Sequence, residues 1–278
     1  MNTMRNGMRL IGIVCAAAGL LWHTVPMADA EPPASADEIV EKANHTAYYQ
    51  GKDGRARVRM TITDAKGRER DRELTILRRD GEDDDRSTHT GEQKYYVYFH
   101  RPSDVDGMAF LVWKHIGRDD DRWLYLPALD LVKRIAASDE RTSFAGSHFY
   151  YEDVSGRGTY EDTHELIRET EEIYVLKHAP KKPELVEFDF YTTQIDKDTF
   201  LPMRTEYTDS GGRVYRVYEV LEVETIDGFP TVTKAKMTDM RDGAYTVLEY
   251  DRISYNVGVS ERVFTERYLR RPPRKYLR

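Results

Sequence analysis

The sequence predicts a mainly β protein, built on one large, strongly curved antiparallel sheet of about eleven strands in a single domain. Beyond residue 55, apolar residues recur at every second position in short runs. Such alternation gives a strand one buried face and one polar face. Turn signals such as Ser210–Gly212 and Asp227–Pro230 separate the runs, which favours hairpins between neighbouring strands. We see no internal repeat and no linker that would divide the chain.

The first thirty residues are expected to be a cleaved secretory signal peptide. Arg5 and Arg9 precede the apolar run Leu10–Trp22, and Ala28–Ala30 has the small-residue pattern of a cleavage site. The run is shorter than the roughly 20 residues that a membrane-spanning helix needs. The expected organisation is a signal peptide (1–30), one domain (31–268) and a basic C-terminal tail (269–278), in a soluble exported protein.

Composition argues against several classes of function. The only cysteine, Cys15, lies within the signal peptide, so the mature chain has no disulfide and no thiol nucleophile. A net charge of −7 disfavours binding to nucleic acid. The histidines form no H-E-x-x-H pattern, and the acidic runs Asp83–Asp85 and Asp119–Asp121 lack the alternate spacing of a calcium loop. We therefore expect no metal site, no cofactor and no nucleic-acid partner.

The mature chain opens with one amphipathic helix. Ser35 and Glu38 have capping-box spacing, and Ile39, Val40 and Ala43 fall on one helical face. The alternating runs follow in two series. The first series comprises Ala56–Asp64, Arg72–Arg79, Lys94–Pro102, Gly107–His115, Asp121–Leu129 and Asp130–Ile135. The second comprises His164–Thr170, Glu172–Pro180, Leu185–Thr193, Met203–Asp209, Arg213–Ile226, Thr231–Met240 and Ala244–Asn256.

The alternation fails between the two series, from Ser138 to Val154. The sequence SFAGSHFYYEDV in this region combines a possible hinge, Gly146, with aromatic residues and two acids, which suits a loop with one or two short helices. We interpret it as a short helical lid. This segment and the N-terminal helix supply few apolar residues, so the strands either pack on themselves or leave a cavity for a ligand.

Aromatic residues near this segment are the candidates for the lining of such a cavity. The candidate cavity and lid residues are Phe110, Trp113, Trp123, Tyr125, Phe144, Phe149 and Tyr150. Aromatic side chains also dominate ordinary protein cores, so a core without a ligand is the alternative. Tyr151, Glu152 and Asp153 are expected to hold the lid to the sheet through polar contacts.

Glu152 and Asp153 are also candidates for the acid–base pair of a hydrolase. Adjacent residues on a helix point about 100° apart, so the two carboxyl groups do not face each other across a substrate. The sequence identifies no second carboxylate at a defined distance, which acid–base catalysis would require. We therefore expect no catalytic residue and no enzymatic activity.

The C-terminal sequence RYLRRPPRKYLR contains six cations and no acid. Such an end is either a solvated tail or a docking strip for an acidic partner or for anionic headgroups. The residues that would make the docking contact are Arg270, Arg271, Arg274 and Lys275.

Four segments occur in a characteristic order: DRWLYLPALDLVKRI, SFAGSHFYYEDV, DKDTFLPMRTEYTDSGGRVYRVYEV and TVLEYDRISYNVGVSERVFT. The most specific motif is W-x-Y-x-P-A at Trp123–Ala128, followed by Lys133 and Arg134. In this order of motifs, the chain resembles the outer membrane lipoprotein-sorting protein family, within the group of LolA- and LolB-like carriers, from about Ala36 to Tyr268. The resemblance implies a half-open β-barrel that is covered by helices and encloses a hydrophobic cavity.

The resemblance also implies a function. Characterised relatives carry the acyl chains of lipoproteins across the periplasm of Gram-negative bacteria, and members similar to this chain are often encoded beside RND-type membrane transporters. We favour a monomeric periplasmic carrier of lipid or lipoprotein acyl chains. The alternative is a non-carrying accessory subunit of an RND-type inner-membrane transporter, and the least favoured class is a carboxylate-dependent hydrolase.

Overall fold

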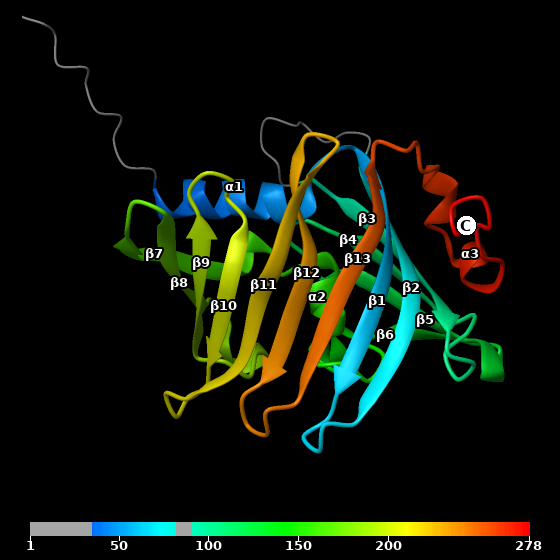
Figure 1. Cartoon of the computed structure of the whole chain (residues 1–278), viewed down its shortest axis with the longest axis horizontal. Helices are drawn as coiled ribbons and strands as arrows, with labels where there is room; N and C mark the ends of the chain where they lie inside the picture. Colours follow the sequence, from blue (N-terminus) through cyan, green and yellow to red (C-terminus); the bar gives the residue numbers. More distant parts are fainter. Residues whose placement is uncertain (1–34, 82–90) are drawn as a thin grey trace, which may run out of the picture. The chain divides into compact units, whose positions relative to one another are not determined.

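The computed structural model describes residues 35–81 and 91–278. The predicted signal peptide and the acidic run Asp83–Asp85 lie outside these residues. The described part contains 13 strands, all in one antiparallel sheet, together with three α-helices (Figure 1). The predicted mainly β class and the single large antiparallel sheet are therefore confirmed.

The first six strands are β1 (Asp53–Thr63), β2 (Glu69–Asp80), β3 (Gln93–Arg101), β4 (Ala109–Lys114), β5 (Asp121–Leu126) and β6 (Leu131–Ile135). The remaining seven are β7 (Asp162–Glu169), β8 (Ile173–Pro180), β9 (Phe190–Asp196), β10 (Pro202–Thr208), β11 (Val214–Ile226), β12 (Phe229–Asp239) and β13 (Tyr245–Tyr255). The helices are α1 (Ala36–Tyr48), α2 (Tyr151–Ser155) and α3 (Glu266–Arg270).

The expected count of about eleven strands was too low. Each alternating run of the sequence overlaps a strand of its own, even where two runs are almost contiguous. Between β5 and β6 a single 3₁₀ turn, Pro127–Leu129, is sufficient, because Asp130 then adopts a left-handed conformation with φ of 43° that reverses the chain.

The sheet is open. Its strand order is β6-β5-β4-β3-β2-β1-β13-β12-β11-β10-β9-β8-β7, so β6 and β7 form the two edges and do not pair with each other. Residues 136–161, hereafter the connector, join these edges and contain α2. Figure 1 shows the sheet bending around α2, with α1 running across one end of the strands. This is the half-open barrel that the family resemblance implies.

The capping-box prediction for α1 is confirmed. The Ser35 side chain accepts a hydrogen bond from the Glu38 backbone N–H at 3.2 Å, and the Glu38 carboxylate accepts one from the Ser35 N–H at 2.8 Å. The buried face of the helix, which includes Ile39, packs against Leu176 of β8 and Ile195 of β9. Helix α1 therefore covers the inner side of the sheet near its β7 edge.

Two hydrophobic layers cover opposite faces of the sheet. The concave layer contains Val58, Val97 and Phe99, together with Phe144 of the connector. Neighbouring residues of a strand point to opposite faces, so Tyr95 joins this concave layer, whereas Tyr96 joins the layer on the convex face. The convex layer must be covered by another part of the chain.

Residues 259–278, hereafter the C-terminal segment, provide this cover. Phe264 and Leu269 are almost completely buried in the convex layer. The Trp113 indole N–H donates a hydrogen bond to the Phe264 carbonyl at 2.8 Å, and the Tyr96 hydroxyl donates one to the Tyr268 carbonyl at 2.8 Å. The solvated-tail alternative is therefore wrong for the segment around Leu269, because the convex face of β3–β5 presents apolar side chains that require cover.

Candidate functional site

A cavity of about 430 Å³ lies on the concave side of the sheet. Its walls come from α1, from α2 and the loop before it, and from strands in both halves of the sheet. Much of the wall is apolar and includes Val58, Met60, Leu74, Val97, Met237 and Leu248. The volume falls within the range of about 300–1,000 Å³ that is usual for small-molecule sites.

Two of the seven candidate aromatic residues line this cavity, Phe144 and Phe149. Phe110 lies behind Phe144, with ring centroids 5.4 Å apart, and belongs to the concave core. Tyr150 is not part of the wall; its ring stacks under the Arg216 guanidinium, whose central carbon is 3.9 Å from the ring centroid.

Trp113, Trp123 and Tyr125 lie on the opposite, convex face, where they pack against the C-terminal segment. The two indole rings contact each other edge to face, with centroids 5.0 Å apart. Trp113 is three positions after Phe110 on the same strand, and residues separated by an odd number point to opposite faces. The alternation within β4 and β5 was therefore the signal that could have separated these three residues from the cavity.

The loop that carries Phe144 and Phe149 is a tight turn rather than a helix. The Phe144 backbone N–H donates to the Phe149 carbonyl at 2.8 Å. Arg72 of β2 donates to the Ala145 carbonyl at 3.0 Å, and the His148 N–H donates to the Thr246 hydroxyl of β13 at 3.1 Å. Strands from the two halves of the sheet therefore hold the turn in place.

Helix α2 is anchored by its acidic residues. The Asp153 carboxylate accepts a hydrogen bond from the Tyr150 N–H at 2.6 Å and forms an ion pair with the buried Arg216 of β11. Tyr151 makes an apolar contact instead, since its ring lies 5.1 Å from that of Phe110. Asp153 lines the cavity, whereas Glu152 does not.

Glu152 belongs to a chain of buried ion pairs that runs along the connector. Its carboxylate lies 3.4 Å from Arg141 and 3.2 Å from Arg157. Arg157 also contacts Asp162, the first residue of β7, at 3.0 Å. Farther along, Arg141 pairs with Glu140 at 2.8 Å, and Glu140 pairs at 2.7 Å with Arg122 of β5. Side-chain contacts thus link β5, the neighbour of the edge strand β6, to β7 at the other edge, and no backbone ladder joins these two strands.

Glu152 gives this chain of ion pairs a dependence on pH. Burial raises the pKa of Glu152 from 4.5 to about 7, against the attraction of Arg157 and Arg141. Between these two pKa values the unfolded chain has released the proton that the folded protein keeps, so the free energy of unfolding decreases as pH rises. A shift of this size corresponds to about 3 kcal/mol, lost between about pH 4.5 and pH 7.

We expect Glu152→Gln to remove this dependence. Urea unfolding of the wild type and of the variant at pH 5, 6, 7 and 8 would measure it, and the variant should gain stability relative to the wild type as pH rises. Parallel pH profiles for the two proteins would show that Glu152 is ionised in the folded state throughout this range.

Several polar groups of the cavity were not anticipated from the sequence. They are the tyrosines on the inner faces of β10, β11 and β13, the last residue of α1, and His178 of β8. Tyr207, Tyr218 and Tyr250 lie at inward positions of their alternating runs, which is the signal that could have identified them.

Among residues 35–81 and 91–278, no cluster of three potential metal-binding side chains is present. Within the same residues, no helix is long and apolar enough to span a bilayer.

Comparison with known proteins finds relatives of the whole domain. A family model described as "-like: Uncharacterized protein" matches residues 91–271, more than half of the chain. Among solved structures, the chain is similar to a DUF1329 family protein from Desulfovibrio piger, with 27% identity and a TM-score of 0.76 over 84% of this chain and 97% of the relative. No curated protein matches the sequence.

Two further solved structures share the fold. An outer membrane lipoprotein-sorting protein domain from Vibrio parahaemolyticus has 25% identity and a TM-score of 0.75, over 85% of this chain and 98% of that domain. A LolA superfamily protein from Nitrosomonas europaea has 20% identity and a TM-score of 0.65, over 84% of this chain and 99% of that protein.

Proposed function

We propose that this chain, which belongs to the DUF1329 family and has the half-open barrel of the lipoprotein-sorting and LolA superfamily proteins, is a periplasmic carrier of lipid or lipoprotein acyl chains. The observation that carries the proposal is the cavity of about 430 Å³ on the concave face, whose wall includes apolar side chains from both halves of the sheet. The export signal predicted for residues 1–30 is consistent with the periplasm.

The energetics of the cavity suit reversible binding. Transfer of a methylene group from water to an apolar environment is favourable by about 0.8 kcal/mol. About ten buried methylene groups therefore supply the roughly 8 kcal/mol of micromolar affinity, before the entropic cost of association is subtracted. A carrier that must release its cargo needs no covalent step, and we assign no enzymatic activity to the chain.

Native mass spectrometry of the mature protein, purified from its own periplasm and then extracted with organic solvent, tests the proposal. We expect a bound mass that extracts as a lipid or acyl species. A protein that is empty, and that also fails to bind an apolar fluorescent dye, would contradict the carrier function.

Phe149 provides a site-directed test. We expect Phe149→Asp to lower the affinity for the dye at least tenfold, because the introduced carboxylate must be desolvated at the cavity wall. Dye titration measures the affinity, and circular dichroism establishes that the variant is folded. Leu221→Asp is the matched control, since Leu221 is 47% exposed and lies outside the cavity wall. Equal dye affinity in both variants would show that Phe149 does not contribute to the binding site.

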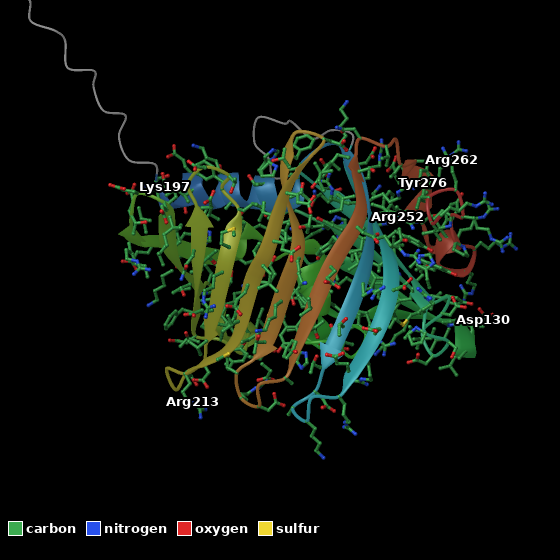
Figure 2. The ribbon with its side chains drawn as sticks, in the orientation of Figure 1. Asp130, Lys197, Arg213, Arg252, Arg262 and Tyr276 are labelled. Atoms are coloured by element: carbon green, nitrogen blue, oxygen red, sulfur yellow. The ribbon has the colours of Figure 1, made fainter. Side chains whose placement is uncertain are left out.

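The exposed cations of the C-terminal segment favour a second candidate function, that of an accessory subunit of an RND-type transporter. Arg270, Arg271, Arg274 and Lys275 are exposed, although neighbouring residues are buried against the sheet. Figure 2 shows Arg262 and Tyr276 on the same C-terminal segment. A basic surface on an acidic protein suits an acidic partner. Replacement of the four residues by glutamine should abolish docking to the transporter but leave cargo binding unchanged. A protein that serves only as an accessory subunit would contain no cargo.

A further inference from the structure

The wall of the cavity contains seven tyrosines, and their hydroxyl groups divide into two classes. Three are hydrogen-bonded within the protein: Tyr95 donates to Gln93, Tyr191 donates to Asp162, and Tyr255 is bonded to Thr231. The other four are Tyr48, Tyr207, Tyr218 and Tyr250. Within residues 35–81 and 91–278, their hydroxyls make no hydrogen bond to another side chain or to the backbone.

These four tyrosines surround one region of the cavity. Tyr48 ends α1, and the other three lie on β10, β11 and β13. The Arg216 guanidinium, which pairs with Asp153, lies 5.1 Å from the centroid of the Tyr207 ring. Burial is the main cause that raises the pKa of Tyr48, Tyr207 and Tyr218, and the charge of Asp153 adds to it. Asp153 itself is paired with Arg216, and within the described residues no hydrogen bond joins it to the tyrosine hydroxyls.

Tyr48 approaches this region from the opposite side. Its ring lies directly against Gly156, where a Cβ atom would be 2.5 Å from the tyrosine Cζ. The Tyr218 ring, in turn, packs edge to face against Phe149, with centroids 6.5 Å apart. The four tyrosines therefore line one cavity together with apolar and aromatic side chains such as Phe149.

One further polar atom of the wall lacks a partner. The Nε2 atom of His178 is buried and makes no hydrogen bond within the described chain, while its Nδ1 atom lies 2.8 Å from His164 Nδ1. His178 is only 4% exposed and stacks on Tyr191, which in turn contacts Tyr207 at 5.3 Å between centroids. A buried polar atom without a partner is costly, so the Nε2 atom of His178, in the same wall as four tyrosines whose hydroxyls have no partner in the described chain, indicates a ligand with polar groups.

The charges of the wall determine what kind of ligand fits. The cations Arg78 and Arg157 are already paired with Asp80 and Asp162, and Asp153 is paired with Arg216. Arg55 also lies along the wall, but it stands opposite Leu77 of the convex layer, so its side chain points away from the cavity. Burial raises the pKa of Tyr250 to about 12, so this hydroxyl remains a neutral donor at pH 7. The cluster thus offers several neutral hydrogen-bond donors and no spare cation, which suits uncharged oxygen atoms better than an anionic headgroup.

We propose that Tyr48, Tyr207, Tyr218 and Tyr250, with His178, form a polar subsite that binds the ester-carbonyl or hydroxyl oxygens of an uncharged glyceride, while the apolar wall holds its acyl chains. This inference rests on the proposed carrier function and specifies the chemistry of the cargo. The same ester groups occur in a free acylglycerol and in the diacylglyceryl anchor of a lipoprotein.

Three ligands of similar chain length, measured with the full mature protein, separate the contributions of hydrogen bonds, headgroup charge and the apolar chain to the affinity. Monoolein carries an ester and two hydroxyls, oleate carries an anionic headgroup, and 1-octadecene carries no oxygen. Displacement of an apolar dye gives the affinity of each. We expect monoolein to bind at least tenfold more tightly than either of the other two, because 1-octadecene forms no hydrogen bond and the oleate carboxylate would be buried without a cation.

The variant to compare is the triple replacement of Tyr207, Tyr218 and Tyr250 by phenylalanine, which keeps the rings and removes the hydroxyls. It should lose about tenfold or more in affinity for monoolein and retain its affinity for 1-octadecene. Tyr125→Phe is the matched control, because the Tyr125 hydroxyl lies on the convex face near Asp130. A dipalmitoyl-glyceryl-cysteine peptide, compared with dioleoylglycerol, identifies which source of the ester binds more tightly.

The outcomes distinguish this inference from the carrier function. Equal affinity of the wild type for monoolein and 1-octadecene, unchanged in the triple variant, overturns the subsite but leaves the carrier. Tighter binding of oleate than of monoolein also overturns it, since the cargo would then be anionic. Failure of the wild type to bind any of the three ligands contradicts the carrier function itself.

Discussion

Replacement of Arg157 by methionine is expected to lower the free energy of unfolding by about 3–5 kcal/mol, the usual cost of leaving a buried charge without its partner. Arg157 contacts Glu152 at 3.2 Å, Glu161 at 2.9 Å and Asp162 at 3.0 Å, and the Asp162 side chain is 1% exposed. Methionine fills a similar volume but does not neutralise the charge of any of these carboxylates. Urea unfolding at pH 7 measures the change.

Arg213→Met is the control for this prediction. Arg213 pairs with Asp209 at 3.1 Å, but its side chain is 83% exposed, and Figure 2 shows it projecting from the turn between β10 and β11. Exposed pairs of this kind contribute about 0–1 kcal/mol. Equal losses in the two variants would show that the ion pairs of the connector do not stabilise the fold more than surface pairs do.

The second large effect is expected on the convex face. Phe264→Ala should cost about 3–5 kcal/mol, because the ring is 1% exposed and its removal leaves a void between the C-terminal segment and the sheet. Chemical denaturation measures the loss, with Leu221→Ala at an exposed position expected to change stability by no more than about 0.5 kcal/mol.

The same Phe264 variant also separates the two faces of the sheet. The ring does not belong to the cavity wall, so dye affinity should be unchanged under conditions in which the variant remains folded. A loss of dye binding by folded Phe264→Ala would instead show that the C-terminal segment controls the shape of the cavity through the sheet.

The sequence predicts the strands well because each alternating run is a local pattern that a sheet buries on one face. The clearest displacement is at β9, which was expected from Leu185 but begins at Phe190. Pro183–Leu185 form a 3₁₀ turn instead, and Leu185 is 58% exposed, so an apolar side chain alone did not identify the start of this strand.

The site was less predictable, since it depends on which face each residue occupies and on partners distant in the chain. Phe144 and Phe149 lie in the cavity wall, whereas Trp113 and Trp123 cover the convex face, because their layer is completed by the C-terminal segment. The pairing of Asp153 with Arg216 joins residues 63 positions apart, and no local pattern indicates it.

The strand order also constrains how the chain acquires its fold. The first six strands form one meander and the last seven form another, and within the described residues the two are joined as a sheet by the pairing of β1 with β13. Because the chain is synthesised from its N-terminus, strands β1–β6 can form early. One edge of β1 then stays unpaired until β13 has been made and can pair with it. Such non-local pairing slows folding, and an open edge invites association with other chains. Newly synthesised molecules should therefore depend on protection of the β1 edge during this interval.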